Sequence, residues 1–272
     1  MATVMSEAER LFSDGQAYER LMGRWSRLVG ASFLNWLDLP RGLRWLEVGC
    51  GNGAFTEELM ARCAPIAVTA IDASEDQLAY ARTRLGASPA QFRIGNAQEL
   101  RFEDHAFDVA AMALVLGFLL DPARALAEMA CVVRPGGWVA TYMWDMPGGG
   151  LPVAPIYATL KELGLEAPLP PRPQDSSQQG MRELWERAGI ESIDTRVIRI
   201  PVVFTSFEDF WESNTVPVGP LGKFLASLAP GANERLRSRL RQQVDVAPDG
   251  HIAYQSFANA IKGRVPMTSR AT

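Results

Sequence analysis

Short apolar runs alternate with segments of helical periodicity between residues 43 and 145. Runs of this kind are typical of strands buried on both faces. They predict strands near residues 43–48, 66–71, 91–94, 107–113 and 137–144. Strands separated by helices predict a parallel sheet covered by helices, with a ligand site beyond the carboxyl ends of the strands. Four residues fall at those ends: Glu47, Asp72, Asn96 and Ala113.

The alternation stops after residue 146. Residues 147–173 are rich in Pro and Gly around one short helical piece, which indicates an inserted loop. A helix near 178–188 and a strand near 193–204 resume the fold. A second insertion opens on Ser206 as a predicted N-cap and contains a charged amphipathic helix near 232–243. An apolar-rich segment over 252–265 follows. The length fits a single domain over residues 1–272.

A glycine loop follows the first strand, with glycines at alternate positions, Gly49, Gly51 and Gly53. Glycines here let the backbone turn sharply and approach a ligand closely. Dinucleotide sites use G-x-G-x-x-G and hold a pyrophosphate, which a carboxylate at Glu47 would repel. The spacing E-x-G-x-G-x-G therefore favours a ligand that carries positive charge. Asp72, at the tip of the second strand, suits the hydroxyls of a ribose.

Five motifs in residues 43–145 resemble those of the Rossmann-like, S-adenosylmethionine-dependent methyltransferases of the ubiquinone and menaquinone biosynthesis type. They are Glu47–Gly53, Ala70–Ser74, Arg93–Gln98, Phe107–Ala111 and Val133–Trp138, in the family's order. The resemblance implies a doubly wound, mostly parallel seven-stranded sheet with an antiparallel last strand. It also implies S-adenosylmethionine as methyl donor, S-adenosylhomocysteine as product and a small-molecule acceptor.

The resemblance further implies a set of cofactor-binding residues: Arg24, Trp25, Glu47, Gly49, Cys50, Gly51, Asp72, Ala73, Gln77, Asn96, Ala97, Gln98 and Ala113. In this set Glu47 would face the cationic end of the donor and Asp72 the ribose. Asn96 would read adenine through its amide oxygen. In the alternative, Ala97 and Gln98 hold adenine through backbone amides and Asn96 only forms the turn. Gly117 stands where many relatives carry a His.

The resemblance also suggests a division of the chain into lid helices at 1–40, a cofactor-binding core at 41–146, and substrate-side insertions at 147–175 and 206–250. In the alternative, the insertions only cover the sheet edge. The apolar stripe of Met22, Trp25 and Val29 predicts an amphipathic helix in the first segment. Arg24, beside that stripe, would meet the methionine carboxylate, or else is a solvated surface residue.

Catalytic residues are not defined by the sequence, and three weak candidates remain. Trp144 and Asp145 close the fifth strand and could hold a substrate ring or a proton. His251 opens the last strand and could act as a base oriented by Asp249, or could be an ordinary surface residue. Methyl transfer from an activated donor requires no dedicated catalytic residue, because alignment and exclusion of water can carry the reaction.

Composition narrows the possible partners. The formal net charge is −4, so no global field attracts nucleic acid. The longest apolar run, Val109 to Leu120, is too short to span a bilayer, and the acidic N-terminus does not resemble a signal peptide. Three cysteines without ligand spacing predict no metal site. We expect a cytoplasmic enzyme without membrane or nucleic-acid partners, with homodimerisation possible. An RNA or protein methyltransferase and a non-catalytic S-adenosylmethionine-binding regulator are the alternatives.

Overall fold

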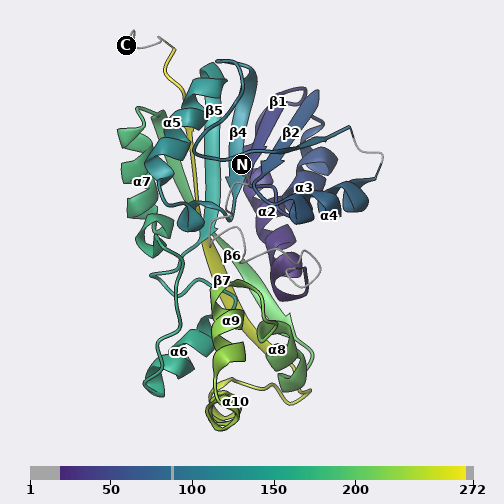
Figure 1. Cartoon of the computed structure of the whole chain (residues 1–272), viewed down its shortest axis with the longest axis vertical. Coiled ribbons are helices and arrows are strands. Elements are labelled where there is room, and N and C mark those ends of the chain that lie inside the picture. The colour runs from purple at the N-terminus through teal and green to yellow at the C-terminus, as the bar shows by residue number, and fades with distance from the viewer. Residues whose placement is uncertain (1–18, 87–88, 268–272) are drawn as a thin grey trace, which may run out of the picture.

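The computed structural model describes residues 19–86 and 89–267 (Figure 1). Residues 1–18 of the predicted lid segment lie outside the described residues. Seven strands form one sheet in the order β3-β2-β1-β4-β5-β7-β6. Their bounds are Arg44–Val48 (β1), Ala67–Asp72 (β2), Gln91–Ile94 (β3), Phe107–Ala113 (β4), Val133–Trp144 (β5), Glu191–Phe204 (β6) and Ile252–Arg264 (β7). Strands β1 to β5 are parallel, and β7 pairs antiparallel with β5 and β6. The predicted fold class is confirmed.

Helices cover both faces of the sheet (Figure 1). Their bounds are Glu19–Gly23 (η1, a π-helical turn), Arg24–Leu37 (α2), Ala54–Cys63 (α3), Glu75–Leu85 (α4), Leu116–Phe118 (η2), Pro122–Val132 (α5), Ala154–Glu162 (α6), Pro173–Ser176 (η3), Gln178–Arg187 (α7), Phe207–Asn214 (α8), Gly219–Ser227 (α9) and Pro230–Gln243 (α10). Ser206 caps α8 as predicted, because its hydroxyl accepts a hydrogen bond from the Asp209 amide at 3.0 Å.

Alternate residues of β4 belong to two different cores. Val109 and Ala111 pack in the cluster that contains α2 and α3, whereas Ala110 and Met112 pack in the cluster that contains α5 and α7. Successive side chains of a strand point to opposite faces, so this division follows from the continuous apolar run. The sheet is thereby buried on both sides, and its open ends are left for a ligand.

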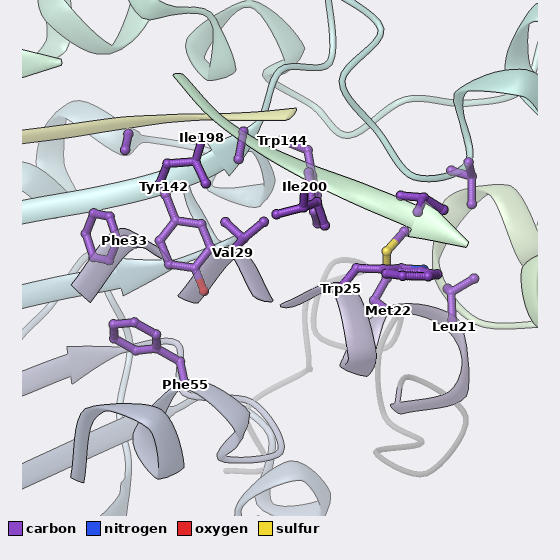
Figure 2. Packing of buried hydrophobic residues seen from close by; sticks show 14 of the residues in the cluster. Leu21, Met22, Trp25, Val29, Phe33, Phe55, Tyr142, Trp144, Ile198 and Ile200 are labelled. Carbon is purple, nitrogen blue, oxygen red and sulfur yellow. The ribbon is translucent and has the colours of Figure 1, made fainter. Parts of the chain in front are cut away.

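An aromatic cluster fixes α2 and α3 over the sheet. The rings of Phe33 on α2 and Tyr142 on β5 have centroids 4.8 Å apart, and Phe55 on α3 lies 5.8 Å from Tyr142 (Figure 2). Ring pairs at these separations stabilise beyond their buried area. The cluster holds α2 close to the glycine loop that precedes α3.

The strand β5 begins earlier than predicted. Val133 pairs with Phe107 and Trp138 pairs with Val109, so the register shifts between the two pairs. The residues in between form a bulge in which Gly136 has a φ of +72°. The segment Val133–Trp138, most of which precedes the strand expected near 137–144, is thus an irregular part of the strand itself.

The β6–β7 pair extends past the rest of the sheet. Pairing of β5 with β7 ends at Trp144 and Ala258, whereas β6 and β7 remain paired as far as Phe204 and Ile252. Helices α6, α8, α9 and α10 gather around this two-stranded extension, in the lower part of Figure 1. Both predicted insertions therefore lie beside each other, beyond the carboxyl end of β5.

Candidate cofactor and acceptor site

A cavity of about 570 Å³ opens at the carboxyl ends of the central strands. The loop after β1, the tips of β2, β4 and β5, the start of α4 and the loop after β3 line it. The N-terminal helices and both insertions complete the wall. Of the predicted cofactor-binding residues, these lie in the wall: Glu47, Gly49, Cys50, Gly51, Asp72, Ala73, Gln77, Asn96, Ala97, Gln98 and Ala113. The sheet thus brings eleven predicted positions to one cavity.

The glycines of the loop are required for different reasons. Gly49 and Gly51 both have positive φ, +77° and +50°, a conformation that glycine adopts without strain. A Cβ on Gly49 would lie 2.5 Å from a methyl group of Val115, whereas a Cβ on Gly51 would meet nothing nearer than 3.9 Å. Gly49 is therefore needed for packing. Gly51 leaves open space in the cavity wall.

Glu47 is fully buried at the end of β1, where it lines the cavity. Its Oε2 accepts a hydrogen bond from the Thr56 hydroxyl at 2.6 Å. Its Oε1 has no hydrogen-bond partner among the described residues. Burial raises the pKa of Glu47 to about 8; the Thr56 hydrogen bond opposes this shift and the nearby Asp72 adds to it. A carboxyl in this position would be stabilised in its charged form by a cationic group in the cavity.

Asp72 is held by backbone amides at the tip of β2. Its Oδ2 accepts from the Gly51 amide at 2.8 Å and its Oδ1 from the Ser74 amide at 2.9 Å. The carboxylate is thereby tied to the glycine loop on one side and to the start of α4 on the other. Ser74 also caps that helix, since its hydroxyl accepts from the Gln77 amide at 3.3 Å. Both acids of the site thus adjoin the glycine loop: Glu47 directly precedes it in the chain, and Asp72 is hydrogen-bonded to it.

The loop after β3 agrees with a turn-forming role of Asn96 but leaves the Gln98 amide unavailable to adenine, because that amide is already bonded to Asn96. Its side-chain oxygen accepts from the Gln98 amide at 2.9 Å, so Asn96 closes the turn. The Gln98 side chain accepts from the Asp121 amide at 2.7 Å and ties the loop to the start of α5. Ala97, between them, lines the cavity. Asn96 and Gln98 are used mainly to shape this wall.

Arg24 and Trp25 do not line the cavity, contrary to expectation. The guanidinium of Arg24 lies against the rings of Trp25 and Phe204, 4.4 and 4.6 Å from their centroids. Its Nη2 lies 3.8 Å from Asp209 Oδ1 and 3.5 Å from the Ser213 hydroxyl, both on α8. The helical phase explains the outcome: Met22 and Ser26 face the cavity, whereas Arg24 contacts α8 and Trp25 packs against Phe204 of β6.

The three weak catalytic candidates differ in their position relative to the cavity. Trp144 is buried in the cavity wall. The side chain of Asp145 accepts from the Gly148 amide at 2.8 Å and shapes the following turn. His251 is largely exposed, with Nδ1 3.2 Å from Asp249 Oδ1, and lies outside the cavity lining. The structure therefore retains one of the three, Trp144, at the site.

Several residues at or next to the cavity wall were not predicted. Thr56 supplies the partner of Glu47 from the first turn of α3, nine residues along the chain. Leu114, directly after β4, has a φ of +61°, an unusual conformation for leucine that often marks functional sites. Asn214 and α9 come from the second insertion. A hydroxyl after the glycine loop could have pointed to Thr56, whereas no local pattern marks the others.

Two further searches of the described residues found no candidates. Across residues 19–86 and 89–267, no group of three or more His, Cys, Asp and Glu could hold a metal ion. Within the same ranges, no helix has the length and apolar character needed to cross a membrane.

Residues 46–141 match the model of a methyltransferase domain. The chain is 34% identical over 169 residues to the O-methyltransferase cnsE of Penicillium expansum, covering 60% of this chain and 57% of that protein. It is 38% identical over 112 residues to the ubiquinone biosynthesis O-methyltransferase of Aromatoleum aromaticum, covering 39% and 47%. These matches span about half the length of the relatives.

A solved structure gives the same fold. The phosphoethanolamine N-methyltransferase 2 of Haemonchus contortus, in complex with S-adenosyl-L-methionine, aligns with a TM-score of 0.58 at 18% identity, covering 96% of this chain and 60% of that one. The glycine loop, the strand-tip acid and the sheet order thus agree with the domain match. Residues 46–141 of this chain are thus similar to a methyltransferase domain, and the described chain shares the fold of a methyltransferase solved with S-adenosyl-L-methionine.

Proposed function

We propose that the protein transfers a methyl group from S-adenosylmethionine to a small molecule. One observation carries the proposal: a fully buried carboxyl, Glu47, lines the same cavity as Asp72 and has one oxygen without a partner among the described residues. A buried polar atom left unpaired is unfavourable. The ammonium group of S-adenosylmethionine would supply both a hydrogen-bond donor and the positive charge that stabilises the Glu47 carboxylate.

The residues present fit the two ends of such a cofactor. Asp72, held by the amides of Gly51 and Ser74, lies where a ribose would be expected from the family resemblance. Gly51 leaves room beside it. When bound, S-adenosylmethionine supplies an electrophilic methyl group on a sulfonium. The chain's own part is to hold the acceptor in line with that group and to keep water out with the apolar wall.

The described lining offers no general base besides the two carboxyls, Glu47 and Asp72, which this proposal assigns to the cofactor. It contains no Lys, Arg or His. The hydroxyl of Tyr157 donates to the Pro168 carbonyl at 3.1 Å, and burial raises the pKa of Tyr157 to about 12. Alignment and desolvation of the reactants then provide the acceleration, for which well-oriented reactants can supply roughly 7–11 kcal/mol. Acceptors that are nucleophilic without help from the protein suit this site best.

Two alternatives, an RNA methyltransferase and a non-catalytic regulator, have little support in the structure. An RNA acceptor would need free cations, and the arginines of α10 are partly paired with acids: Arg239 lies 3.2 Å from Glu162, and Arg241 contacts Glu208. Such pairs describe a solvated helix face rather than a phosphate-binding stripe. Gly117, at the position where many relatives carry a His, is buried against Met143 and Met146. A missing base at that position is consistent with a reaction that needs none.

Titration calorimetry with S-adenosylmethionine tests the proposal. Asp72→Ala should weaken binding by roughly 1.5–3 kcal/mol, the range for a hydrogen bond to a charged group. The control is Asp76→Ala, which removes an exposed acid from the first turn of α4. Equal affinity of wild type and Asp72→Ala would remove Asp72 from the site. No binding to the wild type would overturn the proposal itself.

A further inference from the structure

The cavity has two chemically different ends. Asp72, Gln77 and Asn96 lie on the side of β2 and β3. On the other side of β1 in the sheet order, β5 and the two insertions supply an almost entirely apolar wall. Its members include Met143, Trp144, Met146, Leu151, Val153, Val218, Pro220 and Leu221. If the first end holds the cofactor, as proposed above, the second receives the acceptor.

Besides the tyrosines Tyr142 and Tyr157, one amide side chain interrupts the apolar end. Asn214, the last residue of α8, lines the cavity and is 1% exposed. Its Nδ2 donates to the Phe210 carbonyl at 2.7 Å, which fixes the orientation of the amide, because a carbonyl accepts from nitrogen and not from oxygen. The Oδ1 has no hydrogen-bond partner among the residues that the structure describes.

A structural role accounts for the nitrogen of the Asn214 amide but not for its oxygen. The bond from Nδ2 satisfies a carbonyl in the last turn of α8, and the Thr215 hydroxyl does the same for the Trp211 carbonyl at 2.8 Å. A hydroxyl could therefore end this helix without burying an acceptor. The Oδ1 remains unexplained by the fold, and buried acceptors without partners are rare in native proteins.

The charge of the wall limits the molecule that could pair with this oxygen. The described lining holds Glu47 and Asp72 as acids and no Lys, Arg or His. An anionic acceptor would therefore meet carboxylates and no cationic side chain in the described lining, in an apolar surrounding where an unpaired charge is strongly unfavourable. An electrically neutral molecule is favoured, and the Asn214 oxygen requires that it carry a hydrogen-bond donor.

We propose that Asn214 determines specificity by accepting a hydrogen bond from a neutral, largely apolar acceptor that carries one hydroxyl or N–H group. The proposal rests on the proposed function, because it assigns the apolar end of the cavity to the acceptor. It names the insertion helix α8, rather than the sheet, as the element that selects the substrate. Sites built to bond a donor reject analogues that lack it, since the acceptor is then left unpaired.

A matched set of naphthalenes tests the proposal by calorimetry on protein saturated with S-adenosylhomocysteine. The probes are 2-naphthol with a donor, 2-methoxynaphthalene without one, and 2-naphthoate with a negative charge. Wild type should bind 2-naphthol roughly five- to tenfold more tightly than the ether, as expected for one neutral hydrogen bond. It should bind 2-naphthoate more weakly than either.

The variant Asn214→Leu keeps the size of the side chain and removes the acceptor. It should bring the ratio between 2-naphthol and the ether close to one and leave S-adenosylhomocysteine affinity unchanged. Asn233→Leu is the matched control, because Asn233 on α10 also has a buried Oδ1 without a described partner but does not line the cavity. This control should keep the wild-type ratio.

The outcomes distinguish failure of the Asn214 proposal from failure of the proposed function. A wild type that prefers the ether or 2-naphthoate, or that binds none of the probes, overturns the role of Asn214. So does a preference for 2-naphthol that persists in Asn214→Leu. If that variant does not fold, the comparison of the three probes on wild type still decides. Failure of wild type to bind S-adenosylhomocysteine would instead count against the proposed function, and the probes can then be compared on the unliganded protein.

Discussion

Glu47 is the residue at which stability and binding oppose each other. Its carboxyl is fully buried, and burial raises its pKa to about 8 from an ordinary value of 4.5. The unfolded chain would release this proton at a lower pH than the folded chain. Between about pH 4.5 and 8 the unfolded state therefore binds fewer protons, and the unliganded protein loses stability as the pH rises through that window.

Glu47→Gln should remove this loss. In urea unfolding without cofactor, the free energy of unfolding of the variant should exceed that of the wild type by more at pH 8 than at pH 5. The difference between the two pH values should be on the order of a few kcal/mol. The same change at the exposed Glu103 is the control. Parallel pH curves for wild type and Glu47→Gln would contradict the burial of an isolated carboxyl.

Alanine substitutions at Gly51 and at Gly86 distinguish the effect of backbone strain from a loss of cofactor binding. Their φ angles are nearly equal, +50° and +51°, and a Cβ would have open space at both. Alanine should cost roughly 1–2 kcal/mol of stability at Gly51, the cost of a left-handed residue, and more at Gly86, whose ψ of −117° lies outside the left-handed helical region. Gly51→Ala should in addition abolish stabilisation by S-adenosylhomocysteine in thermal melting, because its methyl group projects into the cavity wall. Equal shifts by the ligand in both variants would show that Gly51 lies away from the cofactor.

At the scale of elements, local pattern predicts a helix but not its partners. The stripe of Met22, Trp25 and Val29 is buried in the core as its spacing predicts. Arg24 beside it contacts Ser213, which is 189 positions away in the chain. Nothing within α2 indicates that contact, because it depends on how the second insertion folds back. The same holds for Asn96, whose identity indicates a turn while its ligand role depends on neighbouring loops.

Arg24→Ala should loosen α8 and leave cofactor affinity nearly unchanged. The Arg24 guanidinium stacks on Phe204 and approaches Asp209, so it joins α2 to the insertion. Hydrogen exchange should show faster exchange of amides in residues 207–214 of the variant. Weaker binding of S-adenosylmethionine with unchanged adenosine binding would instead restore Arg24 as a partner of the methionine carboxylate.

On the scale of the whole molecule, the two ends of the cavity differ in how far sequence predicts them. The glycine loop, Glu47 and Asp72 lie within one stretch of the chain, and their strand and turn signals are local. The acceptor end joins β5 to segments from both insertions, and α9 was not predicted at all. Contacts between distant segments decide that end. The lid role of 147–175 and 206–250 stays a prediction.

A crystal structure with S-adenosylhomocysteine bound tests the central claim most directly. The account predicts the ligand in the cavity, with its ribose hydroxyls within hydrogen-bond distance of the Asp72 carboxylate. Its amino group should lie within the same distance of Glu47 Oε1, the buried oxygen that lacks a described partner. A ligand bound elsewhere, or bound with Glu47 still unpaired, would contradict the assignment of this cavity as the methyl-donor site.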